Sequence, residues 1–242
     1  MFLASSSYAS LRVVPAVVNI FADKNSICEN KYIVTNPEDR AVTIEVGKED
    51  WKNFSGNPSD VSVDRWLNIK KTTLDIGPGE SVEVPFEVVA DDNMVGSVSG
   101  MIVFSAREGM MNFVMKLPIY IVIRGTEQID FSIDSLNIGK SDRDGKIYYA
   151  MNVKNDGNVH IRHGGFIEIY DNKKKDVIKI VRIEETYPVY AQESKVFHGV
   201  VAENGELKKG KYLAVFKIRA FDREIKKKIK FKVSKTGEVV AQ

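Results

Sequence analysis

Hydrophobic and polar residues alternate along most of the chain, and turn-forming residues interrupt the alternation at regular intervals. An alternation with a period of two indicates strands buried on one face, and many short strands between turn residues are typical of a sandwich or a barrel. Helical periodicity is nearly absent. In the first half the pattern predicts strands at residues 11–21, 27–36, 41–47, 66–70, 81–90, 96–107 and 112–124.

The second half repeats this plan, with strands predicted at residues 128–139, 146–154, 165–170, 177–184, 193–202, 210–221 and 223–234. Seven short strands per half is the strand count of an immunoglobulin-like domain. We therefore predict an all-β chain of two tandem immunoglobulin-like antiparallel β-sandwich domains. The first spans residues 10–125, the second spans residues 126–235, and residues 236–242 form a tail.

An internal repeat supports the division into two halves. The segment Val34-Thr35-Asn36-Pro37 parallels Val153-Lys154-Asn155-Asp156, and an alternating strand follows each. Glu80-Ser81 parallels Glu193-Ser194 at the start of a later strand. The shared order of these segments indicates that both halves have the same fold.

Composition narrows the class of protein. Hydrophobic residues make up 43% and charged residues 28% of the 242 residues, as in ordinary globular proteins. No run of 18 uncharged apolar residues occurs, so no transmembrane segment is predicted. Residues 1–9 are uncharged and have small residues at Ser7 and Ala9, which resembles the end of a secretory signal peptide cleaved after Ala9. A plain N-terminal tail is the alternative. We expect an exported protein, periplasmic or on the cell surface.

No motif for catalysis, a cofactor or a metal stands out. His160 and His163 are three residues apart, but no cysteine or carboxylate cluster completes a metal site, so both are interpreted as surface turn residues. The segment Asp142-Arg143-Asp144-Gly145 is interpreted as a hairpin turn. We therefore predict that the protein is not an enzyme and binds no cofactor.

Several segments resemble known families. Trp66-Leu67-Asn68-Ile69, the turn Gly77-Pro78-Gly79-Glu80-Ser81 and the strand pair at residues 98–106 and 112–124 are similar to the first domain of two families. These are the WxL-interacting cell-surface proteins of bacteria and the periplasmic pilus chaperones of the PapD type. Pro188-Val189-Tyr190-Ala191-Gln192-Glu193-Ser194 and Leu207-Lys208-Lys209-Gly210 resemble the second domain of the WxL-interacting family more closely. The chaperone resemblance implies a basic pair that grips a subunit's C-terminus, and Arg12 and Lys116 lie on the corresponding strands.

The most apolar strand is a candidate binding segment. Pro118 within residues 112–123 cannot donate a hydrogen bond to a neighbouring strand, which indicates that one side of this strand is an edge. Such an edge can pair with a strand from a partner. The strict alternation favours the other interpretation, in which this face is simply the core of the first domain. The residues on one face of this strand are Phe113, Met115, Leu117, Ile119 and Ile121.

The last strand carries the strongest charge. Residues 10–125 contain 12 Lys+Arg and 16 Asp+Glu, whereas residues 126–242 contain 23 and 17. The excess lies mainly in a strand that we interpret either as an edge guarded by lysines or as a contact with an anionic surface, such as a cell-wall polymer or lipid headgroups. Nucleic acid is not expected, because the lysines are not regularly interleaved with aromatic positions for stacking. The candidate residues are Lys226, Lys227, Lys228 and Lys230.

These observations predict a non-enzymatic exported binding or scaffold module of the cell envelope, which engages surface proteins or polymers. The alternative is a periplasmic pilus-type assembly chaperone that donates or accepts a β-strand at an exposed edge. In both cases the expected partner is another envelope or surface protein, or an anionic surface.

Overall fold

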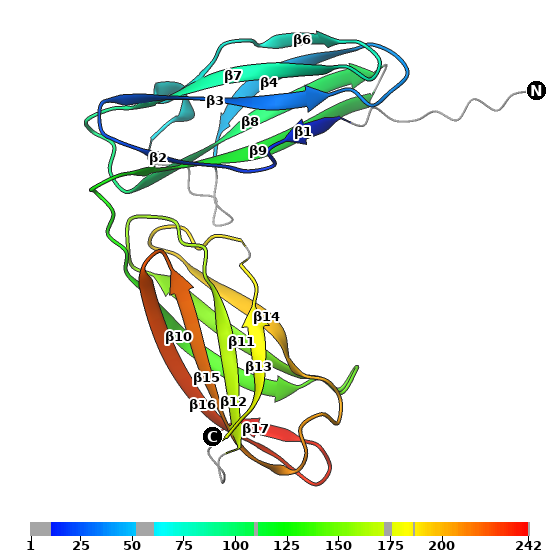
Figure 1. The fold of residues 1–242 in the computed structure, drawn as a ribbon, viewed down its shortest axis with the longest axis vertical. Coiled ribbons are helices and arrows are strands. Elements are labelled where there is room, and N and C mark those ends of the chain that lie inside the picture. The colour runs from blue at the N-terminus through cyan, green and yellow to red at the C-terminus, as the bar shows by residue number, and fades with distance from the viewer. Residues whose placement is uncertain (1–10, 52–60, 109–110, 172–175, 186, 242) are drawn as a thin grey trace, which may run out of the picture. The chain divides into compact units, whose positions relative to one another are not determined.

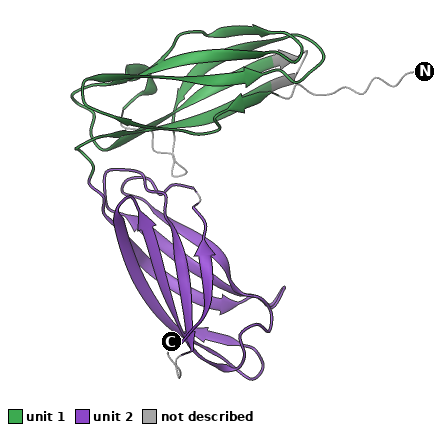
Figure 2. Cartoon of the chain, viewed as in Figure 1, with its two compact units in different colours: residues 1–127 green, residues 128–242 purple. Residues whose placement is uncertain are grey.

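The computed structural model describes residues 11–51, 61–108, 111–171, 176–185 and 187–241, so the segment that resembles a signal peptide lies outside the described residues. The chain forms two compact units, Met1–Glu127 and Gln128–Gln242 (Figure 2). Among the described residues the only helical element is η1, a single 3-10 turn at Val63–Arg65. The predicted fold class is confirmed: each unit is an immunoglobulin-like β-sandwich.

The first unit packs a four-stranded sheet against a five-stranded sheet (Figure 1). Its core lies between them and is centred on the fully buried side chains of Tyr32, Trp66 and Phe104. The first sheet has the order β1 (Arg12–Val14), β3 (Ser26–Thr35), β7 (Ser81–Ala90) and β5 (Leu67–Ile69). The second has the order β2 (Val18–Ala22), β9 (Met111–Ile123), β8 (Ser97–Glu108), β4 (Val42–Asp50) and β6 (Thr73–Ile76).

The first predicted strand, at residues 11–21, is in fact two strands in different sheets. β1 pairs antiparallel with β3, whereas β2 pairs parallel with β9. The change of sheet occurs at residues 15–17, where Pro15 has no N–H for a ladder and interrupts the strand. Residues 13–18 are all apolar, so the sequence shows no polar break between the two strands, which is why the pattern alone predicted one strand.

The second unit has the same two-layer plan. One sheet contains β10 (Phe131–Lys140), β11 (Ile147–Asn155) and β14 (Ser194–Ala202), in that order. The other contains β13 (Val177–Ile183), β12 (Gly164–Asp171), β15 (Gly210–Ala220), β16 (Arg223–Val233) and β17 (Val239–Ala241). The predicted tail is therefore corrected: its residues 239–241 form β17, which pairs with β16.

Asn36 and Asn155 show the physical basis of the internal repeat. Both are fully buried, and their backbone N–H groups donate to the carbonyls of Glu80 and Glu193 at 3.0 and 2.8 Å. Each side-chain amide donates to the carbonyl four residues ahead, at 2.7 and 2.8 Å. Each side-chain oxygen accepts from the N–H two residues ahead. The repeated asparagine thus satisfies the backbone of the loop that leaves the same strand in both units.

Candidate partner-binding edge

Strand β9 is paired on both sides along only part of its length. β8 pairs with it continuously over residues 111–122. On its other side, β2 pairs only with residues 119–123, through Val18 to Ala22. Among the described residues, no strand pairs with the second side of residues 111–118, and we call this segment the open half of β9.

The hydrogen-bond pattern shows which backbone groups face the open side. The N–H of Ile123 donates to Gly96 on the β8 side at 2.8 Å, whereas the N–H of Arg124 donates to Ala22 on the β2 side at 2.9 Å. Successive residues of a strand point their backbone groups to opposite sides, and the β8–β9 pairing has no register shift. The N–H groups of Val114 and Lys116 therefore face the open side.

Pro118 stands at the junction between the open half and the half covered by β2. Pro118 lies two and four residues after Lys116 and Val114, so its backbone faces the same side as theirs. The N–H that proline lacks would therefore have pointed away from β8. A proline at this position costs no bond of the β8–β9 ladder, which explains how it fits within a long strand. Its presence was the one sequence signal for an edge.

The five apolar residues predicted on this strand divide between the two halves. Ile119 and Ile121 are fully buried and lie in the half covered by β2. Leu117 is buried, while Phe113 and Met115 are partly buried and pack against the core. An edge that reaches Ile121 is therefore corrected to one that ends at Pro118. The interpretations as edge and as core strand each describe one half of β9.

The open half presents different chemistry on its two faces. Phe113, Met115 and Leu117 face the space between the sheets, where they leave an apolar strip only partly covered. On the opposite face Val114 is 45% exposed, and the ammonium of Lys116 lies 2.6 Å from the carboxylate of Glu49 on β4. A lysine beside an exposed strand edge disfavours indiscriminate strand pairing.

The two residues of the basic pair implied by the chaperone resemblance lie in different sheets of the first unit. Arg12 alternates with the buried Val13 and so lies on the outer face of the sheet that contains β1. Lys116 lies on the outer face of the other sheet, where it pairs with Glu49. The two cationic side chains therefore belong to opposite faces of the first unit.

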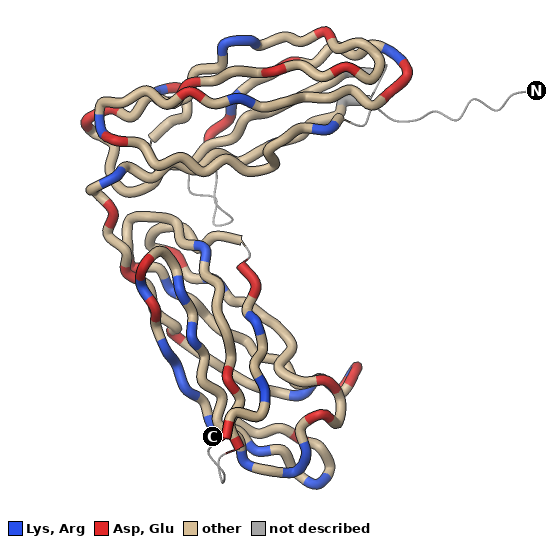
Figure 3. The backbone as a smooth tube through the Cα atoms, viewed as in Figure 1, with Lys and Arg blue, Asp and Glu red and all other residues tan. Residues whose placement is uncertain are grey.

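The lysines of β16 also divide by face, and Figure 3 shows basic residues gathered along this strand. Lys226, Lys228 and Lys230 are exposed on the outer face, where Lys226 pairs with Glu224 at 3.1 Å. Lys227 lies on the same face of β16 as the residues that point to the core. Its ammonium donates to the carbonyl of Ile133 on β10 at 3.2 Å. It therefore links the two sheets, unlike the other three candidate lysines. Its place midway between Ile225 and Ile229 was a signal in the sequence for this inward orientation.

The outer lysines border a shallow groove of about 470 Å³ on the sheet that contains β12, β15 and β16. Lys226 and Lys228 line one side of it, and Tyr170 and Val215 contribute apolar surface. Hydrogen bonds from Lys217 and Tyr170 hold the pKa of the Glu168 carboxyl below its usual range. Beyond residues 231–233, which pair with β17, no described strand covers the second side of β16.

The two histidines of the β11–β12 loop are buried, which corrects their interpretation as surface turn residues. His163 is 1% exposed, and its ring meets that of Phe197 edge-on at 4.3 Å. Burial lowers the pKa of both His160 and His163 to about 4. Both histidines are buried because Ile161, which lies between them, pairs with Val189 and is itself fully buried, so that the loop is drawn into the core. No cluster of three or more potential metal ligands occurs among the described residues.

No protein-family model and no curated protein matches the chain. Several solved structures, in contrast, are similar to the chain. A chain of a chaperone–tip adhesin complex from CFA/I fimbriae biogenesis is 14% identical, with a TM-score of 0.50 over 91% of this chain and 98% of that one. The class 5 fimbriae chaperone CfaA is 13% identical, with a TM-score of 0.48 over 90% and 98%. A chain of the Salmonella enterica SafA pilin–SafB chaperone complex is 9% identical, with a TM-score of 0.46 over 94% and 98%.

The chain has the fold of the fimbrial chaperones. At 14% identity the likeness shows the fold alone, and it extends over both units. The resemblance to pilus chaperones is thereby supported at the level of fold, whereas the resemblance to WxL-interacting proteins gains no support from these comparisons. No helix in the described ranges is long and apolar enough to cross a membrane.

Proposed function

We propose that this protein is a non-enzymatic assembly chaperone that holds a partner subunit by strand pairing along the open half of β9. One observation carries the proposal: β9 is a long strand paired by β8 throughout but by β2 only over residues 119–123. In β-strand addition, main-chain hydrogen bonds supply affinity, and pockets for alternate side chains supply specificity. The open half of β9 offers both kinds of contact.

The backbone contribution comes from Val114 and Lys116, whose N–H and C=O groups face the open side. Each intermolecular hydrogen bond formed there contributes about 1 kcal/mol net, because both partners give up water. The side-chain contribution comes from Phe113, Met115 and Leu117, which already lie in an apolar strip. A partner that lacks one strand of its own sheet would cover this strip and complete its core.

The proposed partner is a pilin or adhesin subunit, the class of protein named in complex with chaperones among the similar structures. The proposed location is the periplasm, since residues 1–9 resemble the end of a secretory signal peptide. An unassembled subunit with an unfilled strand position exposes apolar surface and aggregates readily. Covering that position would keep it soluble until assembly.

A second function, a scaffold that contacts an anionic polymer, is supported by the outer lysines of β16. Lys226 and Lys228 line the groove on that sheet, next to the apolar surface of Val215. Surface charge attraction of this kind is screened at ordinary salt and gives little shape specificity. The open half of β9 supports the chaperone function more strongly, because it offers a directional set of bonds.

Amide hydrogen exchange distinguishes the two functions. The chain is mixed with candidate pilin-type subunits from the same source, and exchange is compared between the free and bound states. Strand pairing is expected to protect the amides of Val114 and Lys116, which face the open side in the free chain. The amide of Ile121 serves as the control, because β8 protects it in both states. Protection confined to β16 would instead favour the scaffold.

A further inference from the structure

One end of the second unit contains a hollow of about 270 Å³ that the proposed function does not use. Three separate segments line it: the hairpin from the end of β10 to the start of β11, the turn between β14 and β15, and the turn between β16 and β17. Figure 3 shows basic residues gathered at this end of the unit. The lysines that line the hollow are Lys140, Lys208, Lys209 and Lys235.

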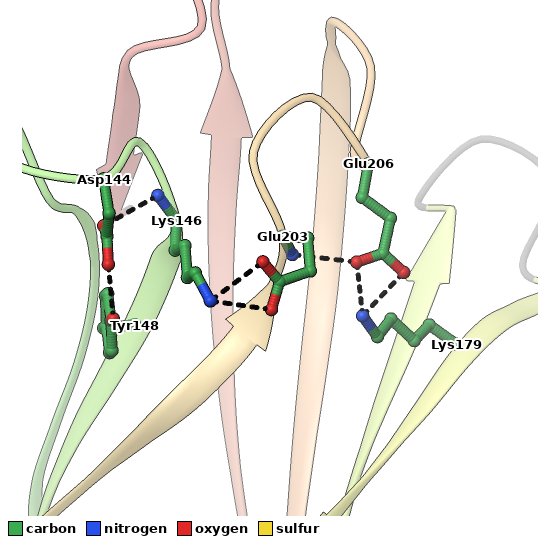
Figure 4. A network of polar contacts seen from close by, with 6 residues as sticks. All are labelled: Asp144, Lys146, Tyr148, Lys179, Glu203 and Glu206. Carbon is green, nitrogen blue, oxygen red and sulfur yellow. Dashed lines mark hydrogen bonds and ion pairs between the residues drawn. The ribbon is translucent and has the colours of Figure 1, made fainter.

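The carboxylates of the β14–β15 turn are already paired with lysines outside this hollow (Figure 4). The carboxylate of Glu203 lies 3.0 Å from the ammonium of Lys146. The carboxylate of Glu206 accepts a hydrogen bond from the ammonium of Lys179 at 2.6 Å. These contacts lower the pKa of the Glu206 carboxyl and raise that of the Lys146 ammonium. Neither glutamate lines the hollow, so neither neutralises its lysines.

The four lining lysines are exposed, and no ion pair joins any of them to another described residue. Asp and Glu are absent from the lining residues. Four lysines around one small hollow concentrate positive charge there, and an anion bound among them would be attracted by all four. The concentration of charge therefore points to a ligand rather than to a stabilising role in the fold.

The turns that carry the lysines are well defined. The hydroxyl of Ser234 accepts from the backbone N–H groups of Thr236 and Glu238 at 3.1 and 3.0 Å, which fixes the β16–β17 turn. Gly237 adopts φ +81, and a Cβ at this position would lie 3.0 Å from the ammonium of Lys140. The absence of a side chain there lets the lysine lie close over the turn.

We propose that this hollow binds phosphate groups, independently of the strand-binding edge. Lysine binds phosphate as a point charge, and four of them match an anion that carries two or more negative charges. The volume suits a phosphate or diphosphate group and is small for a larger organic ligand. Asn204 and Thr236 also line the hollow and carry neutral side chains that can form hydrogen bonds.

The test uses the full chain and two probes. Inorganic pyrophosphate is titrated calorimetrically at low salt, and phosphatidylglycerol vesicles are compared with phosphatidylcholine vesicles by co-sedimentation. The variant carries Lys208→Gln, Lys209→Gln and Lys235→Gln. The matched control carries Lys71→Gln, Lys211→Gln and Lys232→Gln, which removes the same charge from exposed lysines that line neither this hollow nor the groove beside Lys226 and Lys228. Thermal unfolding shows that both variants are folded.

We expect the hollow variant to bind pyrophosphate at least about tenfold more weakly, since each of the three lost charge contacts contributes a factor of roughly two to five. The control is expected to bind within about twofold of the parent chain. Selective sedimentation with phosphatidylglycerol, lost in the hollow variant, would identify the phosphate as that of a lipid headgroup. Equal binding by the parent chain and the hollow variant, an equal loss in the control, or no binding of either probe would overturn the proposal.

Discussion

Val18 pairs with Ile119 in parallel, and this backbone pairing marks where the open half of β9 ends. Towards the C-terminus, β9 lies between two strands and its inward side chains belong to the core. Towards the N-terminus, the same strand has one neighbour, and its inward side chains are partly covered. A single strand thus anchors itself in the fold with one half and offers an edge with the other.

Replacing Val114 with proline should weaken subunit binding without unfolding the chain. The substitution removes an N–H that faces the open side and leaves the β8–β9 ladder intact. We expect about a tenfold loss of affinity, measured by titration with the subunit, because one hydrogen bond is lost and the ring obstructs the approach of a strand. Val114→Ala is the control, since it keeps the N–H and should bind nearly normally. Equal binding by both variants would show that the partner does not pair here.

Truncation of apolar residues should separate folding from binding along the same strand. Ile119→Ala removes a fully buried side chain and should lower the free energy of unfolding by about 2–5 kcal/mol. Met115→Ala removes a partly buried side chain, so it should cost less stability but more subunit affinity. Denaturant unfolding and subunit titration on both variants check this. A larger loss of stability at Met115 than at Ile119 would contradict the division into two halves.

Most of the strands can be predicted from the period-two pattern, whereas short strands and a change of sheet within a strand cannot. The pattern places β7 at its observed bounds, Ser81–Ala90, because alternation and flanking turn residues agree there. It misses β6 and β17, which are short strands of four and three residues. It also joins β1 to β2, because the change of sheet at Pro15 falls within residues 13–18, which are all apolar and contain no polar turn residue.

The candidate edge could be predicted only in part. Pro118 indicates an edge in the sequence, but the extent of that edge depends on which strand pairs with β9, and β2 is about a hundred residues away. Sequence spacing cannot reveal a parallel pairing of this range. The burial of His163 was missed for a similar reason, since the pairing of Ile161 with Val189 draws its loop inwards.

The outer lysines of β16 should contribute to neither stability nor subunit binding. We expect the variant with Lys226→Gln, Lys228→Gln and Lys230→Gln to keep the parent's affinity for a subunit, because the open half of β9 lies in the other unit. Lys227→Gln should instead lower stability by up to about 1 kcal/mol, because its ammonium bonds to the carbonyl of Ile133. A strong salt dependence of subunit binding, abolished in the triple variant, would favour the scaffold function.

Gly100 should not tolerate a larger residue. A Cβ at this position would lie 2.8 Å from the ring of Trp66 and 2.8 Å from the side chain of Val63. Trp66 is 1% exposed, so its indole has little room to shift. Gly100→Ala should therefore cost about 1–3 kcal/mol of stability through overpacking. Gly47→Ala on the neighbouring strand is the control, since nothing lies within 4 Å of its added Cβ. Similar melting temperatures for the two variants would contradict the tight fit.

Acid should destabilise the second unit through His160 and His163. Burial lowers the pKa of each ring from 6.5 to about 4, so the folded state favours the neutral form. The stability is then complete above pH 6.5 and falls as the pH decreases towards 4, because the unfolded chain takes up the protons first. Each histidine can remove about 3 kcal/mol over this range, at about 1.4 kcal/mol for each unit of pKa difference. Denaturant unfolding between pH 7.5 and 4.5 measures the slope. In His163→Gln the slope should decrease by about half, whereas an unchanged slope would show that His163 is already charged or accessible in the folded chain.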